Sequence, residues 1–171
     1  MQTVYLFLLG FVLVAAVSDL WRYRIPNALL VQGLLCAITL HLFMDTGMSW
    51  QQVLWGMLTG LLVLLPFYLF RAMGAGDLKL MTMVGAFTGP MLMPDIVIST
   101  FIVGGVIAAV MLTGRLIVSS ALAQRLDERL GTAIYTLEPQ KKQRLKKLPY
   151  GVAIALGTLI AVNHALVVPA V

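Results

Sequence analysis

The sequence predicts an all-α, polytopic membrane protein. Of its 171 residues, 60% are hydrophobic and only 11% are charged, whereas about a quarter of the residues in a soluble domain are charged. Long apolar runs alternate with short polar breaks, as expected for helices that satisfy their own backbone inside a bilayer. Because the spans use nearly the whole length, we expect a single membrane-embedded domain over residues 1–171.

Six apolar runs are candidate transmembrane helices. The first is not a convincing secretory signal, because no basic residue precedes it and Arg22 and Arg24 follow it. Two pairs of glycines, spaced four residues apart, predict close helix packing inside the membrane: Gly56 with Gly60, and Gly85 with Gly89. The six expected runs are approximately residues 2–18, 27–44, 51–70, 78–93, 95–118 and 150–169.

The basic residues are confined to alternate loops. They follow the first, third and fifth runs, whereas the other two loops hold Asp45 and Asp95. Loops rich in Lys and Arg remain in the cytoplasm. We therefore expect both termini outside, and Asp19 and Asp77 at the cytoplasmic face of the membrane. The same topology accounts for the net charge of +5.

The longest polar stretch, about residues 119–149, is expected to be a cytoplasmic loop with an amphipathic helical segment. Leu122, Leu126 and Leu130 recur every four residues among charged side chains. The basic cluster at 141–147 is expected to contact anionic lipids. We expect no nucleic-acid partner, because no recognition fold or aromatic platform accompanies the charge.

Two carboxylates at the expected cytoplasmic edge are the candidate catalytic residues. Asp77 ends the motif G-A-G-D, in which Gly74 and Gly76 let another backbone come close, and Asp19 ends the first run. Acidic residues at the edge of hydrocarbon are costly to bury and usually functional. Two converging carboxylates can run aspartyl protease chemistry, in which one activates water and the other, protonated, polarises the scissile carbonyl.

The same residues also have structural interpretations. Asp77 can cap the helix that follows it, and Asp19 can form a salt bridge with Arg22 or Arg24. Lys79 either offsets the charge of Asp77 or marks the inner membrane interface. Sequence alone leaves the two interpretations of Lys79 equal.

Residues 149–151 open the last run. Pro149 can start a helix, and Tyr150 suits the membrane interface. In the functional interpretation, this turn with Gly151 lines the groove of the active site.

No cofactor or metal is expected. Cys36 is the only cysteine, which excludes an intramolecular disulfide and a cysteine-based zinc site. The two histidines, His41 and His164, lack the spacing of a ligand pair and are expected to be polar residues near span ends.

In combination, these residues resemble the prepilin peptidases, the G-x-G-D membrane aspartyl proteases of type IV pilus and type II secretion systems. The resemblance implies that Asp19 and Asp77 are catalytic. It also implies cleavage of a basic leader from a prepilin or pseudopilin at the cytoplasmic face, after a glycine. We expect six residues to contact substrate: Gly74, Gly76, Lys79, Pro149, Tyr150 and Gly151. The matching residues are Asp19, Ile25-Pro26-Asn27, Gly74–Asp77 with Lys79, and Pro149-Tyr150-Gly151.

The chain differs from the larger, bifunctional members of that family. Those carry an N-terminal cytoplasmic domain with paired cysteines and also methylate the new N-terminus. Nothing precedes the first run here, and no C-x-x-C occurs. The chain is similar to the small Tad/Cpa-type peptidases that process Flp-type pilins, so cleavage without N-methylation is expected.

Two other classes of function compete with the peptidase. One is a small proton- or ion-coupled transporter, since intramembrane acids also serve proton relays. The acids here lie at one face, however, and no inverted repeat is evident. The other is a non-catalytic assembly subunit of a pilus or secretion system.

Overall fold

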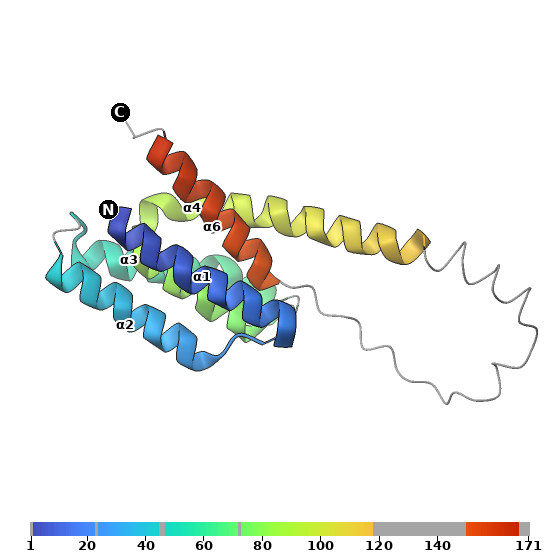
Figure 1. The fold of residues 1–171 in the computed structure, drawn as a ribbon, viewed down its shortest axis with the longest axis horizontal. Helices are drawn as coiled ribbons and strands as arrows, with labels where there is room; N and C mark the ends of the chain where they lie inside the picture. Colours follow the sequence, from blue (N-terminus) through green and yellow to red (C-terminus); the bar gives the residue numbers. More distant parts are fainter. Residues whose placement is uncertain (1, 23, 45–46, 72, 118–149, 168–171) are drawn as a thin grey trace, which may run out of the picture. The chain divides into compact units, whose positions relative to one another are not determined.

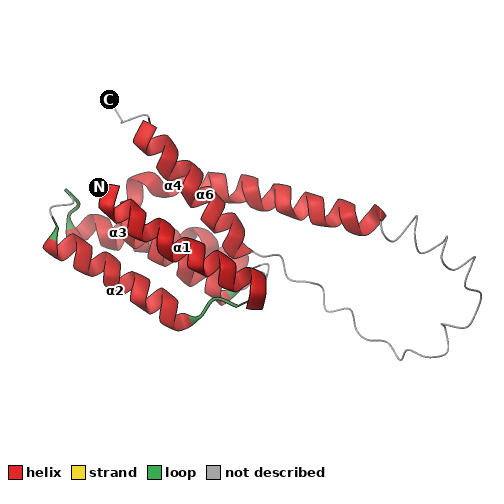
Figure 2. Ribbon diagram, in the orientation of Figure 1, coloured by secondary structure: helices red, strands yellow, loops and turns green. Residues whose placement is uncertain are grey.

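The structure is a computed structural model that describes residues 2–22, 24–44, 47–71, 73–117 and 150–167. The described residues form helices and short loops without strands (Figure 2), which confirms the all-α class. The expected loop at 119–149 and its amphipathic segment lie outside the described residues. The helices, labelled in Figure 1, are α1 (Gln2–Arg22), α2 (Asn27–Phe43), α3 (Trp50–Leu69), α4 (Ala75–Ile117) and α6 (Tyr150–Val167).

The chain divides into two compact units. One contains residues 1–104 and 149–171, and it carries both candidate carboxylates. The other contains residues 105–148, of which the structure describes only the last part of α4. All packing described below lies within the first unit.

Four helices in the described part of the chain are long and apolar enough to cross a membrane, namely α1, α3, α4 and α6. Apolar α2 is shorter, with 17 residues. At a rise of about 1.5 Å per residue, α2 is a few ångströms shorter than a hydrocarbon core of about 30 Å. The expected number of about six spans stays a prediction.

Helix α4 consists of two segments that meet at Gly89. This residue has φ 68° and ψ 179°, a conformation that essentially only glycine adopts. Pro90 follows at once and begins the second segment, where its missing N–H costs nothing. The expected runs 78–93 and 95–118 therefore meet at residue 89, and Asp95 lies within helix rather than in a loop.

The second segment of α4 runs back along α6. Thr100 packs against Gly157, and four residues later Gly104 faces Ala153, which lies one turn closer to the start of α6. Because the start of α6 is bonded to the end of α1, the chain returns after Gly89 towards that end of the bundle. The reversal expected between runs 78–93 and 95–118 is therefore present, but it lies at Gly89 and not at residue 94.

Replacing Gly89 by alanine should destabilise the bundle. A side chain would be strained at this φ, and its Cβ would also meet Met48. Strain of this kind costs about 1–3 kcal/mol. Thermal unfolding in detergent should show a lower midpoint than for Gly10→Ala, a control at a helical glycine with open space around it. An unchanged midpoint for Gly89→Ala would contradict the reversal at this residue.

The first segment of α4, residues 75–88, is the buried centre of the unit. Phe11 of α1 packs on Phe87 with ring centroids 6.3 Å apart. On another side, Gly33 of α2 leaves space that the Met83 side chain fills. The segment that carries Asp77 is therefore enclosed by other helices along most of its length.

Glycines bring α3 and this segment into backbone contact. A Cβ on Gly56 would collide with the Gly85 carbonyl oxygen, and a Cβ on Gly60 would lie 2.5 Å from the Met81 carbonyl oxygen. The expected close packing of the two glycine pairs is therefore confirmed, with Gly89 also against Gly56. Inside a bilayer the hydrophobic effect does not drive helices together. Close van der Waals packing between small residues allows them to associate there.

His41 bonds to a carbonyl at the end of the first segment of α4. Because this segment ends at Gly89, the Ala86 carbonyl receives no hydrogen bond from an N–H four residues later. The Nε2 atom of His41 lies 3.1 Å from that oxygen. A ring nitrogen that faces a carbonyl must carry the proton, so His41 donates there. His41 lies in the last turn of α2, which agrees with the expectation of a polar residue near a span end.

Candidate active site

Both candidate carboxylates are buried at helix ends. Asp19 lies in the last turn of α1 and is 8% exposed, and Asp77 lies in the first turn of α4 and is 9% exposed. Aspartate is almost never buried to this degree without a partner. The partners of each therefore define the site.

Asp19 is held by the start of α6. Its Oδ2 atom accepts a hydrogen bond of 2.9 Å from the N–H of Gly151. Helix α6 begins at Tyr150, so this N–H is one of the donors that have no partner within the helix. The partial positive charge at a helix N-terminus also favours a carboxylate there. Asp19 thus caps α6 from another helix. The sequence had suggested a salt bridge with Arg22 or Arg24, and the partner that the structure shows is the Gly151 N–H.

Gly151 is required by this contact. A Cβ at position 151 would lie 2.9 Å from Oδ2 of Asp19 and 3.1 Å from its Cγ. Real Cβ atoms rarely come so close to other atoms. Any larger residue would push the carboxylate away or displace the start of α6.

Asp77 caps its own helix. Its Oδ2 atom accepts a hydrogen bond of 3.1 Å from the N–H of Gly74, the residue before α4. This is the backward half of a capping box, with the acid at the third helical position. The capping interpretation considered from sequence is confirmed, and it places the carboxylate at the positive end of α4. Gly74 itself is exposed beside it.

The connecting loop between α1 and α2, residues 24–26, joins these two helix ends together with Asn27, the first residue of α2. The Ile25 side chain packs against Gly76, with its Cβ 3.4 Å from the position of a Cβ there. Lys79 Nζ donates a hydrogen bond of 3.1 Å to Asn27 Oδ1. Both carboxylates therefore lie at the same end of the unit.

Residues 6–109 match the type IV leader peptidase family. The chain belongs to this family. No curated protein and no solved structure shows a match to it. Membership makes the protein a peptidase, and hence a hydrolase. Several of its described helices are long and apolar enough to cross a membrane.

The region matched to the leader peptidases contains both carboxylates and the G-A-G-D motif. It ends before residues 149–151, which the structure connects to the site through Gly151 and Asp19. The link between the start of α6 and the rest of the site therefore rests on geometry.

The other residues expected at the substrate site of this leader peptidase are placed as follows. Lys79 bonds to Asn27, and Gly76 packs on Ile25. Tyr150 is half-buried against the apolar core. Pro149 lies outside the described residues. Sequence reasoning gave no role to Asn27, although it lies in the I-P-N motif that carries the family resemblance.

The described residues contain no group of three or more His, Cys, Asp or Glu side chains that could hold a metal ion. What the site offers is two carboxylates, each bonded to a backbone N–H at the start of a helix. This set of groups can move protons and stabilise developing charge.

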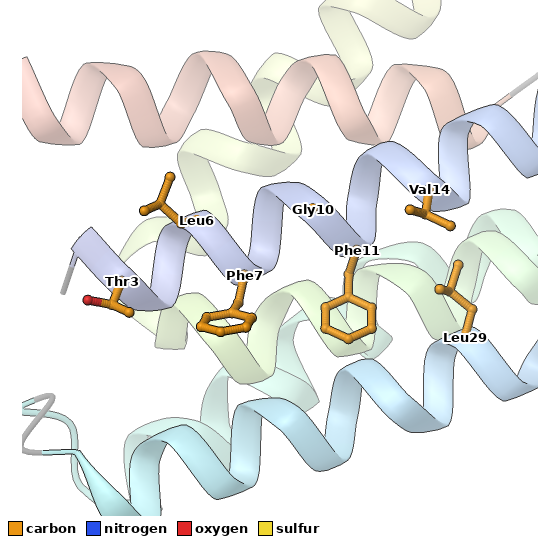
Figure 3. A pocket seen from close by; sticks show the side chains of 7 residues that line it. All are labelled: Thr3, Leu6, Phe7, Gly10, Phe11, Val14 and Leu29. Atoms are coloured by element: carbon orange, nitrogen blue, oxygen red, sulfur yellow. The ribbon is translucent and has the colours of Figure 1, made fainter.

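An apolar groove lies elsewhere, between α1 and α2 (Figure 3). It measures about 520 Å³, and the side chains of Phe7, Phe11 and Leu29 point into it. On α1 its lining residues fall on the side opposite the buried stripe that ends in Asp19. The groove is therefore separate from the carboxylates.

Proposed function

We propose that this leader peptidase is an aspartyl endopeptidase with Asp19 and Asp77 as its catalytic pair. It would remove the basic leader from type IV prepilins or pseudopilins, including those of the small Flp type. The observation that supports this most directly is the pair of buried carboxylates at one end of the unit, each bonded to the N–H of a helix start. A transporter would not require two acids capped in this way at one end of a bundle.

In this mechanism the two carboxylates share one proton. Two like charges close together in a poorly hydrated site cannot both ionise readily, so they titrate as a pair. The ionised member takes a proton from water as the water attacks the scissile carbonyl. The protonated member hydrogen-bonds the carbonyl oxygen and then gives its proton to the departing amine. The N-termini of α4 and α6 carry partial positive charge, which would stabilise the negative charge that develops on the carbonyl oxygen.

The substrate would approach Asp77 across Gly74. This glycine is exposed, and it has no side chain to keep another backbone away. A peptide in an extended conformation can hydrogen-bond to exposed backbone groups in such a place. Gly151 belongs to the site for a different reason, because it accommodates Asp19.

We place the site at the cytoplasmic face of a bacterial inner membrane, with both termini outside. The confinement of basic residues to alternate loops supports this. Within the described unit α1 and α6 run in opposite directions, since the end of α1 bonds to the start of α6 (Figure 1). Reporter fusions at Asp45, Gln140 and the C-terminus should read outside, inside and outside. A cytoplasmic signal from the C-terminal fusion would contradict the topology.

Co-expression with a candidate prepilin tests the proposed activity. The substrate should carry a basic leader, a glycine and then an apolar helix. We expect a shorter pilin with the protein present, and the full-length form with the Asp77→Asn variant at equal abundance. A transporter or an assembly subunit would leave the pilin at full length in both cases.

A further inference from the structure

The connecting loop starts against the helix end that carries Asp19. Ser18, the residue before Asp19, donates a hydrogen bond of 3.1 Å from its Oγ to the Arg24 carbonyl. Pro26 then holds the chain at φ −63° and ψ 130°, and a proline also restricts the residue before it. The loop is therefore short, stiff and bonded to the turn of α1 that carries the first carboxylate.

The same loop ends against the helix start that carries Asp77. Ile25 packs on Gly76, the residue before Asp77. Two residues further along, Asn27 accepts the hydrogen bond from Lys79, which lies two residues after Asp77. The loop and the first residue of α2 thus contact α4 on both sides of the second carboxylate.

The position of Lys79 is not explained by helix stability. Its ammonium group lies at the first turn of α2 and within the first two turns of α4, and both helix starts carry partial positive charge. Exposed polar contacts of this kind also contribute little to folding. Residues that break a local rule without a gain in stability tend to occur at functional sites.

We infer that Asn27 and Lys79 are positioning residues. Their hydrogen bond, called the clamp below, holds the end of the connecting loop against α4 and so keeps Asp77 at a fixed distance from Asp19. The inference rests on the proposed function. Lys79 acts on the reaction through Asn27, and not by contact with substrate as its sequence position suggested. The clamp links residues 52 positions apart and fixes the spacing of the two carboxylates.

Steady-state cleavage of a prepilin peptide tests the clamp. Lys79→Met and Asn27→Leu should each lower kcat about tenfold with KM little changed, because small misplacements of catalytic groups slow the chemical step. The double variant should be no slower than either single variant, because each removes the same contact. Asn27→Asp keeps an oxygen acceptor at this place and should retain most of the rate.

Arg71→Gln is the matched control, since it removes an exposed cation three residues before Gly74. It should keep the wild-type kcat. A raised KM with unchanged kcat in Lys79→Met would show that Lys79 contacts substrate, and the inference would be wrong. Additive losses in the double variant would also overturn it.

A distance measurement separates this inference from the proposed function. Spin labels at exposed positions 21 and 75, in a Cys36→Ala background, report the spacing of the ends of α1 and α4. The distribution should be narrow with the clamp intact and broader in Lys79→Met and Asn27→Leu. An unchanged distribution overturns the clamp whether or not the protein cleaves prepilin. Broadening in a protein that cleaves no prepilin supports the clamp and rejects the proposed function.

Discussion

Asparagine at position 19 or 77 is expected to abolish prepilin cleavage. Each carboxylate has to hold or release a proton in the proposed reaction, and an amide can do neither. Loss of one acid–base group typically costs about 10²–10⁴-fold in rate. Because the two carboxylates act as one unit, the double variant should be no slower than either single variant. The measurement is cleavage of a prepilin peptide by purified protein.

Asparagine is the right replacement because both aspartates also cap helices. Asp19 accepts from Gly151 and Asp77 accepts from Gly74. An asparagine side chain keeps an oxygen acceptor and caps helices about as well as aspartate, whereas alanine costs about 0.5–2 kcal/mol. Capping by Asp77 was already one interpretation of the sequence, and the structure adds that Asp19 caps α6. Asparagine variants should therefore accumulate normally.

Asp95→Asn provides the matched control. Asp95 is exposed on α4 beyond Gly89, and the same chemical change there should leave cleavage unaffected. If Asp19→Asn or Asp77→Asn, verified as folded, cleaved at close to the wild-type rate, the assignment of that residue to the catalytic pair would be wrong.

Alanine at position 151 is expected to have the next largest effect. The new Cβ would lie 2.9 Å from Oδ2 of Asp19 and 3.1 Å from its Cγ. Either the carboxylate turns away or the start of α6 moves, and in both cases the bond to the helix N–H is lost. A displacement of about 1 Å at a reacting group can cost roughly a hundredfold in rate.

The measurement is kcat of Gly151→Ala beside its thermal unfolding midpoint. We expect a large loss of kcat with only a modest loss of stability, because the changed contact lies at a helix end. Gly10→Ala, where a new Cβ has open space, should match the wild type in both. Wild-type kcat in Gly151→Ala would show that the bond between Asp19 and the start of α6 has no role in catalysis.

The helical class and the two carboxylates could be read from sequence because their signals are local. Long apolar runs report a membrane environment whatever the packing. The G-A-G-D motif and the acid before Arg22 are likewise visible as short patterns. The glycine pairs also predicted close helix packing, since small residues at four-residue spacing serve that purpose, and the structure shows that α3 and α4 are the helices that meet there.

The contacts that build the site could not be read in this way because they join distant segments. Asp19 and Gly151 are 132 positions apart, and Asn27 and Lys79 are 52 apart. Which helix start lies beside which carboxylate depends on how the helices pack, and one sequence does not show that. A motif match likewise cannot distinguish a residue that contacts substrate from one that positions its neighbour, as for Lys79.

The reversal in α4 was expected about five residues too late, for a different physical reason. Apolar sequence continues on both sides of Gly89, and the expected runs 78–93 and 95–118 placed the break beside Asp95. Glycine needs no polar loop to reverse the chain when its φ is positive. The Ala86 carbonyl beside this break has a polar partner in His41, which lies 45 positions away in α2.

The most direct test of the central claim is mass spectrometry of a synthetic prepilin segment incubated with the purified protein in lipid. The segment should contain a basic leader, a glycine and an apolar helix. We expect two products, cut after the glycine, and no cut with Asp19→Asn. An intact peptide after incubation with folded wild-type protein, or equal cleavage by the Asp19→Asn variant, would contradict the central claim.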